Sequence, residues 1–240
     1  ASILAALAMA GSMQSVEATI PEGTATGTDA FAIGPQSNVN GAFGFAIGNN
    51  SKFNGGTLGF AIGVNSEAKS NQSIAIGYLS KAIGRNNGGG GDPALAVGAG
   101  ANATEAGTSA FGLSANASGT YATAIGFKST VSGNDGMAIG ASSKASKQGA
   151  SAMGPGARAY GNGAISLGYQ ALSGANTYTG AANSAAPFDD KDATINTYAK
   201  WGDAAIGLRA VATGGNATAL GRSASATAAN AIAIGGGNGR

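Results

Sequence analysis

The chain contains no cysteine and no histidine among its 240 residues, and only 10% of its residues are charged. Without these two residue types it has no thiolate nucleophile, no imidazole base, no Ser-His-Asp triad and no zinc site of the usual ligand type. Disulfide bonds are excluded for the same reason. We therefore expect a protein that is not an enzyme and that holds neither a cofactor nor a metal ion.

Aromatic residues and net charge are also scarce. Thirteen basic and 11 acidic residues leave a formal net charge of +2, and the concentrated positive patch of a nucleic-acid-binding surface is not visible. Aromatic residues make up 6% of the chain, whereas 43 residues are glycine. We expect a narrow core of alanine and glycine, with neighbouring backbones close together.

A tripeptide of a small residue, a large apolar residue and glycine recurs along nearly the whole chain. The residue two places before the glycine is alanine in every copy except one, which has Ser166. Most steps between these glycines are 14 residues long, with single steps of 15, 21 and 39 residues. Such a period predicts a stacked repeat protein. The repeat glycines are Gly34, Gly48, Gly63, Gly77, Gly98, Gly112, Gly126, Gly140, Gly154, Gly168, Gly207, Gly221 and Gly235.

The residues after each repeat glycine alternate in character. The third is serine or alanine, the fourth is mostly polar and the fifth is small or apolar, as in Ser37, Asn38 and Val39. This period of two predicts a strand with one buried face. Each unit therefore holds two short strands, and units of this size must stack to form a core. The sequence predicts an all-β parallel β-solenoid of about 13 coils.

The strand before each repeat glycine is apolar on both faces. Its alanine can fill the interior of a narrow coil, while the large residue beside the glycine points to the other side. A ladder of such residues in water would exceed the apolar patches that soluble monomers tolerate. We therefore expect a closed homo-oligomer that buries this ladder.

Three segments resemble a known repeat closely: residues 73–80 (SIAIGYLS), 136–143 (GMAIGASS) and 231–235 (AIAIG). They resemble the head repeat of YadA-like trimeric autotransporter adhesins, and the resemblance spans residues 28–240 apart from two insertions. It implies a left-handed parallel β-roll in each chain and a homotrimer about a threefold axis. It also implies a bacterial cell-surface or extracellular protein that attaches to host extracellular matrix, host cells or other surfaces.

Carried over onto this sequence, the resemblance places one large apolar residue of each coil in the trimer contact. These residues are Ile33, Ile47, Ile62, Ile76, Val97, Ile125, Ile139, Leu167, Ile206, Leu220 and Ile234. The neck, heptad stalk and membrane anchor of the family are not recognised after Gly235. Two functions stay open on this basis: the head of a surface adhesin, or the subunit of a self-assembling extracellular filament built from such trimers.

The longer steps predict insertions near 85–92 and near 174–200, and we interpret the 15-residue step at 54–56 as a β-bulge.

Loops that project from a rigid scaffold often bind partners, and the second insertion is rich in aromatic and acidic residues. Its possible ligand contacts are Tyr178, Phe188, Asp189, Asp190, Lys191, Asp192, Tyr198 and Trp201. The alternative is a lid that packs on the roll or on a neighbouring chain. The aspartates lack calcium-site spacing, so we expect a solvated acidic turn.

Residues 1–27 hold no repeat and form a separate N-terminal apolar segment. Its first ten residues are too short to span a membrane, and no transmembrane segment is expected in this chain. Three roles for residues 1–20 stay open: a cap over the first coil, a plug that inserts into a neighbouring trimer, or the remnant of a secretion signal.

Overall fold

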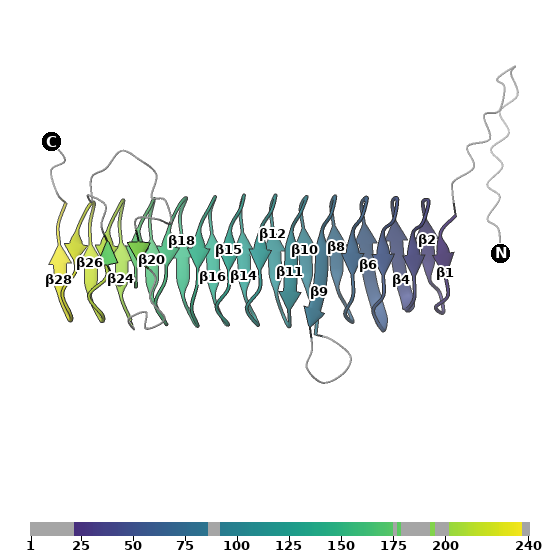
Figure 1. Cartoon of the computed structure of the whole chain (residues 1–240), viewed down its shortest axis with the longest axis horizontal. Helices are drawn as coiled ribbons and strands as arrows, with labels where there is room; N and C mark the ends of the chain where they lie inside the picture. The colour runs from purple at the N-terminus through teal and green to yellow at the C-terminus, as the bar shows by residue number, and fades with distance from the viewer. Residues whose placement is uncertain (1–21, 86–91, 175–176, 179–192, 195–201, 237–240) are drawn as a thin grey trace, which may run out of the picture.

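The computed structural model describes residues 22–85, 92–174, 177–178, 193–194 and 202–236. These residues form strands and turns, and none of them lies in a helix. The coils follow one another in sequence order along a rod, from β1 at one end to β28 at the other (Figure 1). The prediction of an all-β parallel solenoid of about 13 coils is confirmed. No helix in this described part is long and apolar enough to cross a membrane.

Two parallel sheets of 13 strands each form the walls of the rod. Sheet A contains the strands that precede the repeat glycines: β2 (Phe31–Ile33), β4 (Ala42–Ile47), β6 (Thr57–Ile62), β8 (Ile74–Ile76), β10 (Leu95–Val97), β12 (Ser109–Phe111), β14 (Thr123–Ile125), β16 (Met137–Ile139), β18 (Ser151–Met153), β20 (Ile165–Leu167), β24 (Ala204–Ile206), β26 (Thr218–Leu220) and β28 (Ile232–Ile234).

Sheet B contains the strands that follow these glycines, together with β1, which lies before residue 28 and pairs with β3. Its strands are β1 (Thr24–Ala25), β3 (Asn38–Val39), β5 (Lys52–Phe53), β7 (Glu67–Ala68), β9 (Lys81–Arg85), β11 (Asn102–Glu105), β13 (Asn116–Ala117), β15 (Thr130–Val131), β17 (Lys144–Ala145), β19 (Arg158–Ala159), β21 (Leu172–Ser173), β25 (Val211–Ala212) and β27 (Ser225–Ala226).

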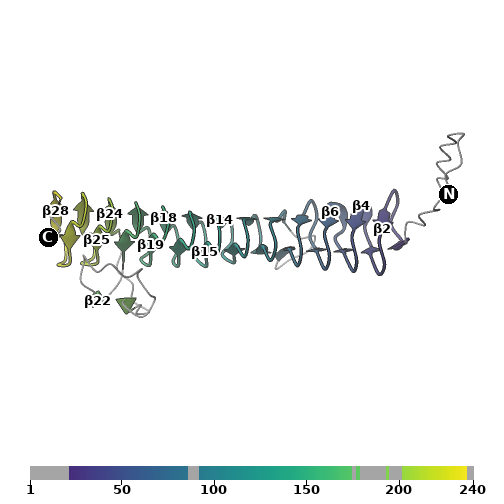
Figure 2. The ribbon, with the colours of Figure 1, turned by 90° about the horizontal axis from the view of Figure 1, so that it is seen from above.

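Both ladders continue across the two long steps in the sequence. Strand β20 pairs with β24 and β21 pairs with β25, so the coils on either side of the longer insertion are direct neighbours. Strands β9 and β11 pair across the shorter insertion, with a register shift between Ala103 and Glu105. A separate antiparallel pair, β22 (Thr177–Tyr178) and β23 (Ala193–Thr194), belongs to neither large sheet, and Figure 2 shows β22 outside the rod.

The extra residue of the 15-residue step lies in a turn. Val39 pairs with Phe53, and Ala42 pairs with Thr57, so the additional residue falls between Phe53 and Thr57. Both ladders keep their register through this coil. The prediction of a β-bulge was therefore wrong: a turn at the edge of the roll absorbs an added residue without breaking any strand pairing.

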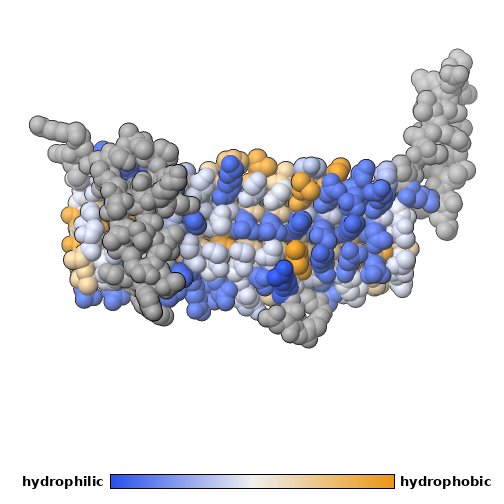
Figure 3. All heavy atoms as spheres, viewed as in Figure 1, coloured by the Kyte–Doolittle hydropathy of each residue, from blue (hydrophilic) through white to orange (hydrophobic). Residues whose placement is uncertain are grey.

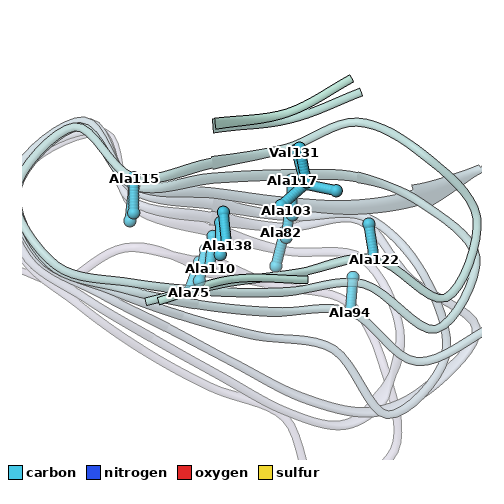
Figure 4. Packing of buried hydrophobic residues seen from close by; sticks show 14 of the residues in the cluster. Ala75, Ala82, Ala94, Ala103, Ala110, Ala115, Ala117, Ala122, Val131 and Ala138 are labelled. Atoms are coloured by element: carbon cyan, nitrogen blue, oxygen red, sulfur yellow. The ribbon is translucent and has the colours of Figure 1, made fainter. Parts of the chain in front are cut away.

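The core is a narrow stack of alanine side chains between the two sheets (Figure 4). Ala75, Ala110 and Ala138 project from sheet A toward Ala103 and Ala117 of sheet B, and all are completely buried. Larger residues are accommodated where the opposite wall offers space. The ring of Phe53 lies against Gly44 and Gly59, where an added Cβ would come within 2.2 Å of it.

The repeat glycine forms one corner of every coil, and two constraints act on it in every coil except the last. It adopts a φ between 116° and 134° in all copies, a region that other residues rarely occupy. An added Cβ on Gly34, for example, would lie 2.7 Å from the carbonyl oxygen of Gly48 in the next coil. Position and conformation together restrict this corner to glycine.

The serine three places after the repeat glycine closes the same corner from inside. Ser37, Ser66 and Ser143 donate their hydroxyl hydrogens to the carbonyl oxygens of Gly34, Gly63 and Gly140, at 2.8–2.9 Å. These hydroxyls are therefore satisfied although the serines are buried. Coils with alanine at this position bury a side chain of similar size without that hydrogen bond.

Candidate functional site

The outer face of sheet A carries a continuous column of large apolar side chains. In the ladder, Ile33 pairs with Ile47, Ile62 with Ile76 and Ile125 with Ile139, and the other large residues before the repeat glycines continue the column. In the single chain these side chains are partly to well exposed, with 38% for Ile125 and 43% for Leu220. We call this line the central column.

The structure places all predicted trimer-contact residues in the central column. They are Ile33, Ile47, Ile62, Ile76, Val97, Ile125, Ile139, Leu167, Ile206, Leu220 and Ile234. Two further members were missed: Phe111 lies between Val97 and Ile125, and Met153 between Ile139 and Leu167. Both directly precede a repeat glycine, which is the sequence signal that identifies them.

A second column lies two residues earlier on the same face of sheet A. Its N-terminal members are Phe31, Phe45 and Phe60, whose rings follow one another at centroid distances of 5.9 and 5.2 Å. Further along the rod it includes exposed Met137 and Ile165. We call it the leading column, because it precedes the central column in the chain.

A third column, which the sequence reasoning did not identify, consists of the residues directly after the repeat glycines. Leu113, Phe127 and Tyr169 in this column are each about half exposed. Val64, Tyr78 and Leu208 are exposed in the same way. We call it the trailing column. The signal was available, because a large apolar residue recurs at this fixed place after the glycine.

The outer face of sheet B is mostly polar. Lys52, Glu67 and Lys81 are neighbours in its ladder, and Glu67 forms a 2.8 Å ion pair with Lys69. Asn102 donates a 3.1 Å hydrogen bond to Asn116 one coil further on. In the view of Figure 3, hydrophilic residues predominate over the N-terminal half of the rod. Such a face suits contact with water or with a polar partner.

Sheet B departs from this polarity near the longer insertion. Tyr160, Leu172 and Val211 occupy outward positions, yet they form a fully buried cluster. The Nζ atom of Lys144 lies 5.7 Å from the Tyr160 ring centroid, and Figure 2 shows β22 beside this part of the rod. These residues are apolar, but their outward positions in the repeat predict exposure, so their burial was not expected.

A buried carboxylate holds the roll together just after the same insertion. Asp203 is completely buried, and its Oδ1 atom accepts hydrogen bonds from the backbone N–H groups of Gly215 and Ala217, each at 2.8 Å. In other coils this inward position carries a small residue such as Ala122 or Gly136. Asp203 therefore ties the coil that follows the insertion to the next one.

The possible ligand contacts in the longer insertion lie outside the described residues. This holds for Phe188, Asp189, Asp190, Lys191, Asp192, Tyr198 and Trp201, and for the side chain of Tyr178, whose backbone belongs to β22. Within the residues that the structure does describe, no three acidic side chains gather as a metal site would require.

A comparison with family profiles agrees with this repeat architecture. The family profile of the YadA head domain repeat, which spans two copies, matches residues 25–51, 55–80, 117–143, 145–171 and 212–238. No curated protein sequence matches the chain. Among solved structures, the collagen-binding domain of the Yersinia adhesin YadA is similar, with 25% sequence identity over 68% of this chain and 83% of that chain and a TM-score of 0.45. Because the five matched segments together cover more than half of the sequence, the chain belongs to the family of YadA head domain repeats.

Proposed function

We propose that this chain is the head of a trimeric bacterial surface adhesin, in which three copies pack through the outer face of sheet A. The observation that carries the proposal is the exposed central column, which runs from Ile33 to Ile234 along the whole rod. Burying one of these half-exposed side chains is worth roughly 1–2 kcal/mol. Summed over the coils of three chains, this gain favours association strongly.

Association through sheet A leaves sheet B and its polar outer face directed away from the partner chains. The rod would then present the lysine, asparagine and serine residues of sheet B to its surroundings. We propose that this face and the insertion at 174–200 contact the host matrix, host cells or other surfaces, outside the bacterial cell. The support is the family membership together with the polarity of this face, and binding rather than catalysis is the activity proposed.

The test combines assembly with adhesion. Light scattering of the full chain at micromolar concentration should give the mass of three chains, and the trimer should bind to immobilised matrix proteins or cells above an albumin-coated control. A folded, soluble monomer would contradict the trimeric head. Long filaments in electron micrographs without surface binding would favour the alternative function, a subunit of an extracellular filament.

A further inference from the structure

Residues 22–26 cover the N-terminal end of the roll, at the end of the rod that β1 and β2 form (Figure 1). Glu22 forms an antiparallel bridge with Ile33 at the edge of sheet A, and the N–H group of Gly23 donates a 3.3 Å hydrogen bond to the carbonyl oxygen of Ala32. The chain then crosses to sheet B, where β1 pairs with β3. The two strands of the first repeat coil, β2 and β3, therefore both have a partner at this end.

Side-chain size and further hydrogen bonds fix this crossing. A Cβ atom on Gly23 would overlap the hydroxyl and carbonyl oxygens of Ser37, so only glycine fits between the two sheet edges. The backbone N–H groups of Thr24 and Thr26 donate hydrogen bonds of 2.9 and 3.0 Å to the carbonyl oxygens of Ser37 and Val39. A cap from further upstream is therefore not needed over the first coil.

The segment before this cover has the composition of a secretion signal. Residues 1–21 lie outside the described part of the chain, so only their sequence bears on their role. Residues 3–10 (ILAALAMA) are all apolar, and the first charged residue of the chain is Glu17. A secretion signal contains an apolar region of about 7–15 residues, which is too short for a membrane span. The five residues 11–15 (GSMQS) that follow the apolar run are mostly polar.

Two places in this segment have small side chains spaced as at a signal cleavage site. One is residues 8–10 (AMA), which lie inside the apolar run, and the other is residues 16–18 (VEA), which follow the polar stretch. The cleavage site of a secretion signal comes after its apolar region, and this order favours the second place. Cleavage there removes the whole apolar run and leaves only residues 19–21 before the bridge that Glu22 forms.

We propose that residues 1–18 belong to a secretion signal and that a signal peptidase hydrolyses the peptide bond between Ala18 and Thr19. The attacking water gives its hydroxyl group to the carbonyl carbon of Ala18 and a proton to the nitrogen of Thr19, which becomes the new N-terminus. The mature chain then begins three residues before Glu22, and the roll keeps every contact described above. This processing site goes beyond the proposed function, because it depends neither on the trimer nor on the ligand.

Export of the full chain from a bacterial host tests the cleavage directly. A short lysine-rich leader is added before Ala1, because a secretion signal begins with a positively charged region and the first basic residue of this sequence is Lys52. The chain recovered from outside the inner membrane should have the mass of residues 19–240, and N-terminal sequencing should begin at Thr19. Both measurements use the denatured chain, so they do not depend on folding.

Three variants separate the two candidate positions. Ala18→Phe places a large ring where a signal peptidase accepts only small side chains, and it should abolish cleavage after residue 18. Ala18→Ser keeps a small side chain there and should preserve the cleavage. Ala10→Phe is the matched control at the other position and should be processed in the same way as the unmodified chain.

A comparison of shortened chains tests whether residues 1–18 contribute to the roll. A chain that begins at Thr19 should match the full chain in melting temperature and in the mass measured by light scattering. A chain that begins at Gly27 lacks β1 and the bridge of Glu22, so it should melt at a lower temperature.

The outcomes separate this inference from the proposed function. Cleavage after residue 10, failure of export, or export with residues 1–18 retained would overturn the processing site. A lower melting temperature of the chain that begins at Thr19 would also overturn it, because residues 1–18 would then stabilise the roll. A chain that is cleaved after Ala18 but remains a monomer would contradict only the proposed trimeric head.

Discussion

Gly126 and Gly140 occupy the same corner of successive coils, and a Cβ atom on Gly126 would lie 2.7 Å from the carbonyl oxygen of Gly140. The backbone of one coil therefore fills the space that a side chain would need in the previous one. Because the φ of Gly126 is also 125°, two separate constraints act on one position.

Replacement of Gly126 by alanine should destabilise the roll by roughly 3–5 kcal/mol, through backbone strain and a clash with the next coil. Gly235 provides a matched control, since its φ is 133° but no atom lies within 4 Å of its added Cβ. Gly235→Ala should cost only the strain, roughly 1–3 kcal/mol. Thermal denaturation followed by circular dichroism measures both changes, and equal losses would show that the clash contributes nothing.

Replacement of Ile125 by aspartate should dissociate the trimer or unfold it, because the charge would be buried at the threefold axis without a partner. Thr130 lies on the outer face of sheet B in the same coil, so Thr130→Asp is the control and should leave the assembly intact. Light scattering and the melting temperature report the difference. A stable trimer carrying Ile125→Asp would place the association surface elsewhere.

The serine at the inner corner should tolerate loss of its hydroxyl better than an increase in volume. Ser66→Ala removes one buried hydrogen bond to Gly63 and should cost roughly 0.5–1.5 kcal/mol. Ser66→Val adds volume to a filled column and should cost about 1–3 kcal/mol more than the alanine variant. Ala101 occupies the equivalent place in another coil, so Ala101→Ser should change the free energy of unfolding by less than about 1 kcal/mol. Melting temperatures check this prediction: Ser66→Ala should melt below the unmodified chain, Ser66→Val should melt lower still, and Ala101→Ser should melt close to the unmodified chain.

Deletion of residues 176–200 should leave the rod folded and weaken its adhesion. This deletion gives Gly168 and Gly207 the ordinary spacing of 14 residues, and β20 and β21 already pair directly with β24 and β25. A lower melting temperature after the deletion would reveal a structural role of the insertion. Unchanged adhesion would exclude the insertion as a ligand contact. Deletion of residues 86–91, in the shorter insertion, is the control and should leave adhesion unchanged.

The sequence predicted the features that recur with the 14-residue repeat, and it predicted few features outside that repeat. Gly126, Ala124 and Ser129 stand at places of the 14-residue period that carry, respectively, glycine, almost always alanine, and serine or alanine. Their roles as corner, core residue and small inward-facing residue therefore follow from spacing and size. The turn at 54–56 was misassigned because one added residue fits a strand or a turn equally well in a sequence. The burial of Tyr160 and Leu172 was missed because their positions in the repeat predict an outward face.

The number of chains in the assembly does not follow from the repeat in the way that the coil structure does. A single sequence shows that Ile125 and its equivalents must be buried in an interface between chains. It does not show how many chains form that interface. Trailing-column residues such as Leu113 and Phe127 escaped notice because the repeat was defined by the tripeptide that ends at the glycine. The structure made them recognisable as a line on the surface.

The direction of the backbone hydrogen bonds also determines how the rod responds to force. The bonds that pair the strands of each sheet link one coil to the next, so they run along the rod, and the successive coil-to-coil pairings are arranged in series. Pairings in series all carry the same tension, so the weakest coil-to-coil pairing would open first, and the chain would come apart there instead of resisting as a unit. Lateral contacts between chains, which restrain every coil at once, would therefore set the load that such an assembly withstands in flowing liquid.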